Sequence, residues 1–355
     1  ARGAANSGKP ADRQVKVVET QGGLPKKFIA TGASMANVRL ADLINEAPAL
    51  AKLGIDGIAL PVNAKDQFGN KIGSDGIAAP IPCTASRLRP FIKDLKTMST
   101  LDGLKESLIY INWSPTAKYR LSWTAEKRWE MFAHNMNMMA KLAKVCKLKG
   151  LFIDVGELDR PGQFVMTKKE KSYSYGALTR EVRRRGRAVG KAIFSAYPDI
   201  VLFSTSWFSA EARLADPSDE SSADRLEKSG SLWPAFVNGI VDVMPLTARL
   251  VDGGGNGSRE AKTNDYHKAM SDLWAVSHAL VDEVNEAKLL TVLSAAAGDT
   301  LTRYSKDSPR HQFWRNLSQA ARTSTEYVWI DVGDVAIAGK GASEQSLRIY
   351  DLKNV

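Results

Sequence analysis

The sequence predicts an α/β fold, a (β/α)8 or TIM barrel with long loops on its C-terminal face. Eight short apolar runs rich in β-branched residues alternate with longer amphipathic stretches, as expected of βα units around a parallel sheet. The runs begin about 30 to 55 residues apart, which leaves room for a helix in every crossover. The length of 355 residues lies within the range of such a barrel, about 250 residues plus insertions.

The eight predicted strands have similar lengths and compositions. In chain order they are residues 27–32, 57–62, 108–113, 150–155, 200–205, 241–245, 288–293 and 327–331. Residues 25–355 are therefore expected to form one domain, preceded by a flexible N-terminal segment over residues 1–24. The small, polar start of this segment is typical of what remains after a signal peptide is removed, so we expect a secreted or periplasmic protein.

Two of the intervening stretches show a clear helical pattern. Residues 126–147 repeat apolar side chains at a spacing of about 3.6 residues, which predicts a helix with one face in the core. Residues 175–197 predict a second helix that ends before Pro198. We expect its arginine-rich stretch, residues 180–187, to form an exposed face.

Two long segments do not fit the regular alternation of predicted strands and helices. Residues 63–100 follow the second predicted strand, and residues 209–233 follow the fifth. Loops at the C-terminal ends of the strands build the active site of a (β/α)8 barrel. These segments are therefore expected to form walls or lids of a cleft.

Composition and charge exclude several classes of function. No run approaches the roughly 18 apolar residues of a membrane-spanning helix, and two cysteines are too few for a disulfide scaffold. The net charge of +10 suggests an acidic partner, and an anionic glycan fits better than nucleic acid, because no nucleic-acid-binding module is visible. The four histidines lack metal-ligand spacing and no phosphate-binding loop occurs, so neither a metal nor a cofactor is expected.

Carboxylates after the fourth predicted strand are the strongest indication of a catalytic site. Asp154 and Glu157 should emerge at the mouth of the barrel, with Asp159 just beyond them. Cleavage of a glycosidic bond needs one carboxyl group to protonate the leaving oxygen and a second to act as nucleophile or to activate water. The alternative interpretation is that Asp154 caps a loop and that Glu157 is only solvated.

Three aspartates are candidates for the second carboxylate. Asp252 precedes a glycine-rich stretch in which the backbone can approach a ligand closely, although Asp before Gly is also favourable in turns. Asp331 and Asp334 follow the eighth predicted strand. Any of the three could pair with Glu157 across the barrel.

The predicted substrate-binding residues surround these acids. They are Asn112, Trp113, Asp154, Trp207, Trp329 and His267. Aromatic rings near the strand ends are suited to stack on the apolar faces of sugar rings. Each tryptophan alone fits a core position better, and only the set of three favours sugar binding.

Several segments resemble the uncharacterised, bacterial glycoside-hydrolase-like barrel family of secreted polysaccharide-degrading systems. They are Phe28 to Gly32, His134 to Met136, Leu148 to Asp154 with Glu157, Trp233 to Gly239, Leu250 to Gly253 and Glu326 to Ile330. The resemblance covers about residues 27–334, implies a (β/α)8 barrel, and places the central acid of the family on Glu157. This chain has Gly-Gly-Asn where the family has Gly-Asn-Glu, so one carboxylate of the family is missing. The last strand of the family usually leads to a Glu, and Asp334 is the acid nearest to that position here.

The sequence thus predicts a glycoside hydrolase acting on a polysaccharide or oligosaccharide. Glu157 would be the general acid/base, and Asp252, Asp331 or Asp334 its partner. A carboxyl separation of about 5 Å would imply retention of configuration, and roughly 6.5–9.5 Å inversion. The alternative is a non-catalytic carbohydrate-binding barrel with an incomplete acid pair. A metal-dependent barrel hydrolase is disfavoured by the scarcity of histidines.

Overall fold

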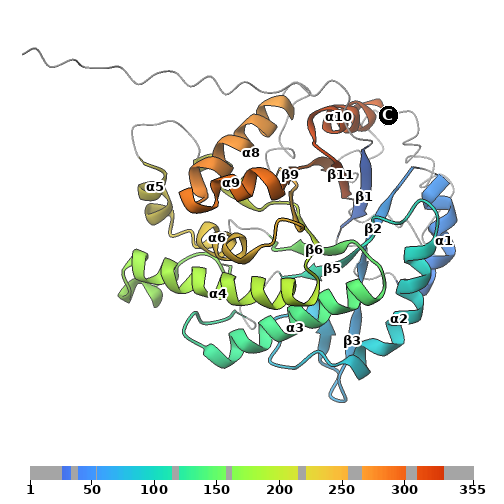
Figure 1. The fold of residues 1–355 in the computed structure, drawn as a ribbon, viewed down its shortest axis with the longest axis horizontal. Coiled ribbons are helices and arrows are strands. Elements are labelled where there is room, and N and C mark those ends of the chain that lie inside the picture. Colours follow the sequence, from blue (N-terminus) through green and yellow to red (C-terminus); the bar gives the residue numbers. More distant parts are fainter. Residues whose placement is uncertain are drawn as a thin grey trace, which may run out of the picture.

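Parallel strands surrounded by helices form a (β/α)8 barrel, as the sequence predicts. The computed structural model describes residues 26–32, 39–52, 54–113, 120–156, 162–214, 221–254, 266–300 and 310–331. Within these ranges, hydrogen-bonded neighbours follow one another around the sheet in the order β10, β11, β1, β2, β5, β6, β7, β8 and β9 (Figure 1). The predicted N-terminal segment, residues 1–24, lies outside the described residues.

The strands of this sheet are short and almost completely buried. Their bounds are β1 Lys27–Thr31, β2 Gly57–Pro61, β5 Leu108–Asn112, β6 Gly150–Asp154, β7 Val201–Ser204, β8 Arg249–Asp252, β9 Leu293–Ala295, β10 Ala297–Thr300 and β11 Tyr327–Asp331. Only Ala296 separates β9, which pairs with β8, from β10, which pairs with β11. The two segments therefore act as one bent strand that joins the ends of the sheet and closes the barrel.

Helices follow the strands and cover the outside of the barrel (Figure 1). They are α1 Leu40–Lys52, α2 Ala85–Thr100, α3 Glu126–Val145, α4 Tyr175–Ala196, α6 Trp233–Val243, α8 Tyr266–Leu280, α9 Glu283–Val292 and α10 Arg310–Thr323. Shorter elements lie in the loops: the hairpin β3 Asn63–Lys65 and β4 Lys71–Gly73, the 3-10 turns η2 Ser74–Gly76, η4 Glu170–Ser172 and η5 Phe208–Leu214, and α5 Ser222–Ser229. Of the helices in the described ranges, none has the length and apolar character needed to cross a membrane.

Two of the eight predicted strands were wrong. Residues 241–245 cover the end of α6 and the two residues after it, and residues 288–293 cover the second half of α9 and the first residue of β9. The actual strands follow a few residues later, in β8 and in the bent strand β9–β10. Short apolar runs occur on the buried faces of helices as well as in strands, so hydrophobicity alone does not separate the two.

Both predicted helices are confirmed, but the arginine-rich stretch of α4 is not simply an exposed face. The side chain of Arg185 is 3% exposed, forms ion pairs with Glu126 and Glu181, and donates hydrogen bonds to the carbonyl oxygen of Trp123. Arg183, on the same helix, pairs with an aspartate of α6. Part of the positive charge of the chain is therefore neutralised within the fold.

The interior of the barrel is filled by side chains from alternating positions of the strands. They are Ile29, Ala59, Leu108, Tyr110, Phe152, Val201, Phe203, Val251, Ala296, Tyr327 and Trp329. Alternation along a strand puts every second residue on the same face, so these residues identify which positions point inward. The same parity predicts the orientation of the last residue of each strand.

Helices α4 and α6 pack with their backbones almost in contact. A Cβ atom on Gly186 would lie 2.1 Å from the carbonyl oxygen of Phe236, and one on Gly239 would lie 2.2 Å from the carbonyl oxygen of Arg183. Only glycine fits at either position. The two helices thereby form a tightly packed pair on the outside of the barrel.

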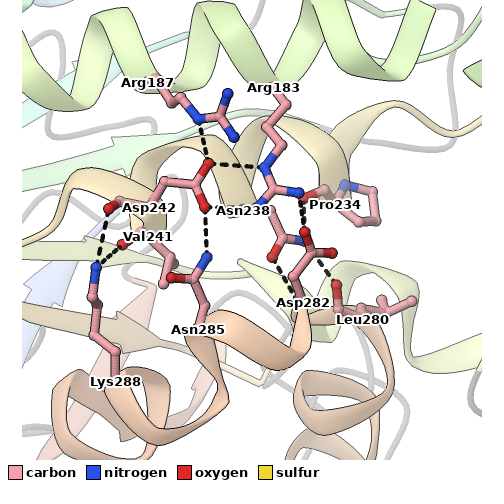
Figure 2. Close-up of polar contacts among 10 residues, drawn as sticks. All are labelled: Arg183, Arg187, Pro234, Asn238, Val241, Asp242, Leu280, Asp282, Asn285 and Lys288. Carbon is pink, nitrogen blue, oxygen red and sulfur yellow. Dashed lines mark hydrogen bonds and ion pairs between the residues drawn. The ribbon is translucent and has the colours of Figure 1, made fainter. Parts of the chain in front are cut away.

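An aspartate at the end of α6 links this pair to α9 (Figure 2). Asp242 accepts hydrogen bonds from Arg183 Nη2 at 2.7 Å, Arg187 Nε at 2.5 Å and Asn285 Nδ2 at 2.6 Å. Lys288 of α9 donates to the carbonyl oxygens of Val241 and Asp242 at 2.9 and 3.1 Å. Charge-assisted contacts thus connect the helices α4, α6 and α9.

The close contact between α4 and α6 makes Gly186→Ala a sensitive test of this packing. We expect the substitution to lower the free energy of unfolding by about 1–3 kcal/mol, because an added methyl group forces the backbones apart. Urea denaturation monitored by circular dichroism measures the change. Gly176→Ala in the same helix is the matched control: its nearest neighbour would be the Arg180 guanidinium at 3.7 Å, so its stability should stay equal or rise. Equal losses in both variants would contradict the packing argument.

The ion pairs of Asp242 predict a pH-dependent contribution to stability. Burial alone would raise the pKa of Asp242, but hydrogen bonds from Arg183, Asn285 and Arg187 outweigh it, and the pKa lies below its ordinary value. Such a group stabilises the fold above its unfolded pKa of about 3.9, and this contribution is lost as the pH falls through the folded pKa. We expect Asp242→Asn to cost about 1–3 kcal/mol at pH 7 and progressively less below about pH 4. Urea titrations of both proteins at several pH values test this, and a pH-independent difference would contradict it.

Candidate active site

Polar residues replace the apolar core where the strands end at the C-terminal mouth of the barrel. The inward-facing positions at the ends of four strands are Thr31, Asn112, Asp154 and Asp331. The register places Asn112 beside Asp154 and Thr31 beside Asp331. The C-terminal mouth, where active sites of this fold lie, is therefore lined by hydrogen-bonding and acidic groups.

A tyrosine beneath the mouth holds one of these acids. The hydroxyl of Tyr110 donates a hydrogen bond of 2.6 Å to Asp154 Oδ2, and the backbone N–H of Gly156 donates one of 2.8 Å to Asp154 Oδ1. Burial raises the pKa of Tyr110 far above its ordinary value, and the negative charges of Asp154, Asp75 and Asp331 raise it further. The hydroxyl therefore stays protonated and fixes the orientation of the Asp154 carboxylate. The carboxylates of Asp75 and Asp331 also lie close enough to act on this hydroxyl.

The segment after β2 supplies one wall of the mouth. Asp75, in η2, accepts a 2.8 Å contact from Lys71 and a long hydrogen bond of 3.5 Å from Asn112. Asn63 at the start of β3 donates to the Asp75 carboxylate at 3.3 Å and accepts from the Asp75 backbone N–H at 3.0 Å. Asp75 and Tyr110 are not among the site residues predicted from the sequence. Alternation along the third predicted strand, residues 108–113, places Tyr110 on the same face as Asn112 and could have indicated it.

Asp154 and Asp331 lie on opposite walls of the barrel. Asp154 ends β6 and Asp331 ends β11, and in the strand order β1, β2 and β5 separate them on one side. On the other side they are separated by β7, β8 and the bent strand β9–β10. A ligand in the mouth would therefore lie between the two acids.

Asp252, the sequence candidate for the second carboxylate, is sequestered in the fold. It is 0% exposed and accepts hydrogen bonds from the Ser209 N–H at 2.9 Å, the Ser209 hydroxyl and the Gly254 N–H at 3.2 Å. Burial raises the pKa of Asp252, while these hydrogen bonds act in the opposite direction. Because Val251 points into the barrel, Asp252 points outward, where it ties the end of β8 to η5. The assignment of Asp252 to catalysis is corrected accordingly.

Two of the three predicted sugar-stacking tryptophans belong to an outer aromatic core. Trp113 is 3% exposed, and its ring centroid lies 4.5 Å from that of Phe132. Trp207 is 1% exposed and stacks on Trp233 at 5.5 Å with an interplanar angle of 3°. Trp113 follows the inward-facing Asn112 and so points outward, towards α3 and α6. Their prediction as ligand-stacking residues is corrected to a role in packing.

Trp329 points inward, but its ring fills the barrel instead of opening to a ligand. It is 0% exposed, and its indole Nε1 donates a 2.8 Å hydrogen bond to the carbonyl oxygen of Gly253. A Cβ atom on Gly253 would lie 2.8 Å from this Nε1, and one on Gly298 would lie 2.4 Å from Cδ2 of the same indole. Gly253 lies in the glycine-rich stretch that was predicted to let the backbone approach a ligand. In the structure it makes room for Trp329 instead.

The remaining predicted site residues divide into two groups. Asn112 and Asp154 lie at the mouth as expected, whereas His267 is exposed near the start of α8. Glu157, Asp159 and Asp334 lie outside the described residues, and their roles stay predictions. Among the side chains that the structure does describe, no group of three or more His, Cys, Asp or Glu is arranged to hold a metal ion.

Comparison with known proteins identifies the fold but no family. No protein-family model matches the chain, and no curated protein matches its sequence. A broad-specificity GH5-4 endoglucanase from an uncultured bacterium is similar in structure, with a TM-score of 0.51, 8% identity and 92% of each chain covered. A GH18 chitinase from Pseudoalteromonas aurantia has a TM-score of 0.44 and 15% identity over 86% of this chain and 94% of that one. A 3-keto-D-glucoside 4-epimerase from E. coli also has a TM-score of 0.44, with 12% identity, covering 92% of this chain and 97% of that one.

The surroundings of Asp252 predict that it contributes to stability and not to turnover. An asparagine there would keep one acceptor oxygen and turn its NH2 group towards an N–H donor. We expect Asp252→Asn to lower the free energy of unfolding by about 1–3 kcal/mol. Asp102→Asn, whose carboxylate is 97% exposed, is the matched control and should change stability by less than about 0.5 kcal/mol. Unchanged stability with lost glycan turnover would restore Asp252 as a catalytic candidate.

Proposed function

We propose that this protein is a glycoside hydrolase that cleaves a polysaccharide or oligosaccharide between acids on opposite walls of the barrel mouth. The observation that carries the proposal is the polar mouth itself, where Asp154 is fixed by Tyr110 and faces Asp331 across the barrel. The barrel shared with the endoglucanase adds carbohydrate as a substrate class by analogy of fold only.

The proposed roles follow from the order of the strands. Glu157, three residues after Asp154, is the general acid that the sequence indicates, and Asp331 is its partner. Asp154, which two hydrogen-bond donors hold in place, binds and positions the substrate. Asp252 is buried in the fold and Asp334 lies outside the described residues, so Asp331 is the partner candidate that the described structure places at the mouth.

The separation of the two carboxyl groups determines the stereochemical outcome. About 5 Å between them implies retention of configuration, and roughly 6.5–9.5 Å implies inversion, because an inverting enzyme needs room for a water molecule.

A second candidate function is a non-catalytic carbohydrate-binding barrel. The observation that favours it is the sequestration of Asp252, which removes one of the acids available for a catalytic pair. Such a protein would keep the polar mouth and bind glycans without cleaving them.

The decisive experiment is the release of reducing sugar from a panel of neutral and anionic polysaccharides. We expect Glu157→Gln to lower kcat by about 10²- to 10⁴-fold, the usual contribution of general acid–base catalysis, with glycan binding retained. Asp331→Asn should lower kcat similarly, whereas the exposed control Asp102→Asn should not.

The outcomes separate the two functions. Glycan binding without release by the native protein would support the binding barrel and contradict the hydrolase. Unchanged turnover in Glu157→Gln would show that another group is the acid. NMR of the freshly released anomer shows whether the configuration is retained or inverted, and thus whether the carboxyl groups are about 5 Å or roughly 6.5–9.5 Å apart.

A further inference from the structure

The hairpin formed by β3 and β4 carries an aromatic side chain away from the barrel. The two strands pair antiparallel, with Ala64 opposite Ile72, and residues 66–70 form the tip. Phe68, within this tip, is 78% exposed, more than any other aromatic side chain of the described residues. Figure 1 shows the hairpin, near the label β3, reaching past the nearby end of α2 at the lower edge of the molecule.

One aspartate makes the tip rigid. Asp66 Oδ1 accepts hydrogen bonds from the backbone N–H groups of Phe68 at 2.9 Å and Asn70 at 2.8 Å, and Oδ2 accepts from Asn70 Nδ2 at 2.9 Å. Gly69 adopts a positive φ of 80°, which the turn requires. The backbone of Phe68 is thus fixed before any ligand arrives, which reduces the entropic cost of binding.

The base of the same hairpin is part of the mouth. Asn63, at its first residue, and Asp75, just after its last strand, form the wall described above. Ser74 fastens this base to the end of β2, because its hydroxyl accepts a 2.7 Å hydrogen bond from the Val62 N–H. Asp66, at the start of the tip, follows Asn63 by three positions, roughly 10 Å of extended chain at 3.3 Å per residue.

We propose that Phe68 is a sugar-stacking residue of a distal subsite, which binds the part of a long glycan that extends beyond the mouth. The proposal rests on the proposed function. The ring is the one large apolar group of the tip, and its exposed neighbours Lys65, Gln67 and Asn70 carry hydrogen-bonding groups. A pyranose ring has the matching surface, an apolar face bordered by hydroxyl groups.

Other partners fit this tip less well. Insertion into a membrane surface would require several apolar side chains, and Phe68 is the one large apolar side chain of this tip. A protein partner would require a larger apolar area than one phenyl ring provides. The continuity of the hairpin with the mouth instead matches a ligand that occupies both at once.

The experiment measures how binding depends on glycan length. Isothermal titration with dimers and hexamers of cello-, chito- and galacturonate oligosaccharides is carried out in the Glu157→Gln background, so that the probes are not consumed. We expect Phe68→Ala to weaken hexamer binding about 3- to 10-fold, the size of one aromatic contact, and to leave dimer binding unchanged. Phe68→Trp should preserve hexamer binding. Val284→Ala, which removes a side chain 83% exposed on α9, is the matched control and should have no effect.

Each outcome decides the question. Equal hexamer affinity in Phe68→Ala and its parent would overturn the distal subsite and leave the proposed function intact. Equal weakening for dimers and hexamers would also overturn it, because a distal subsite cannot act on a dimer bound at the mouth. If none of the probes binds the parent and the native protein releases no sugar from any polysaccharide, the proposed function and this inference fail together.

Discussion

Closure of the barrel around Trp329 is the constraint on which the rest of the structure depends. The indole fills the interior just below the mouth, and it fits because Gly253 and Gly298 leave space on either side. The bend at Ala296 then lets one strand pair with β8 through its first half and with β11 through its second. Closure in this way places β11 opposite β6. The two inward-facing acids at the ends of those strands therefore face each other across a mouth whose floor is apolar.

Alternation along the strands distributes the polar residues between the mouth and the outer layer. Asn112 and Asp154 point inward at the end of neighbouring strands, whereas the residue after Asn112, Trp113, points outward into an aromatic core. The same rule sends Asp252 outward. A carboxylate buried there is costly unless it is hydrogen-bonded, and Ser209 and Gly254 supply the donors. A shift of one position along a strand thus decides whether its terminal acid points into the mouth, as Asp154 does, or outward to stabilise a loop, as Asp252 does.

Charged residues of the outer helices form ion pairs with one another and so stabilise the packing of these helices. Arg183 and Arg187 neutralise Asp242 between α4 and α6, and Arg185 is buried against Glu126 and Glu181. The arginine-rich stretch of α4 is therefore not by itself evidence of an anionic ligand, because these arginines are paired within the fold. The polar mouth and the hairpin that carries Phe68 are better indications of the ligand, because hydrogen bonds hold both in a fixed geometry.

The sequence by itself determined the barrel, six of its eight strands and the position of Asp154 and Asp331 at strand ends, because strand and helix periodicities are local properties of the chain. Local pattern could not separate the buried face of α9 from a strand, which displaced one strand prediction. Nor could it show that Trp113, Trp207 and Trp329 are packed, or that Asp252 is bound by Ser209, since those contacts join residues distant in the sequence. Tertiary structure alone decided which acids share the mouth, because orientation depends on strand register and on closure of the sheet.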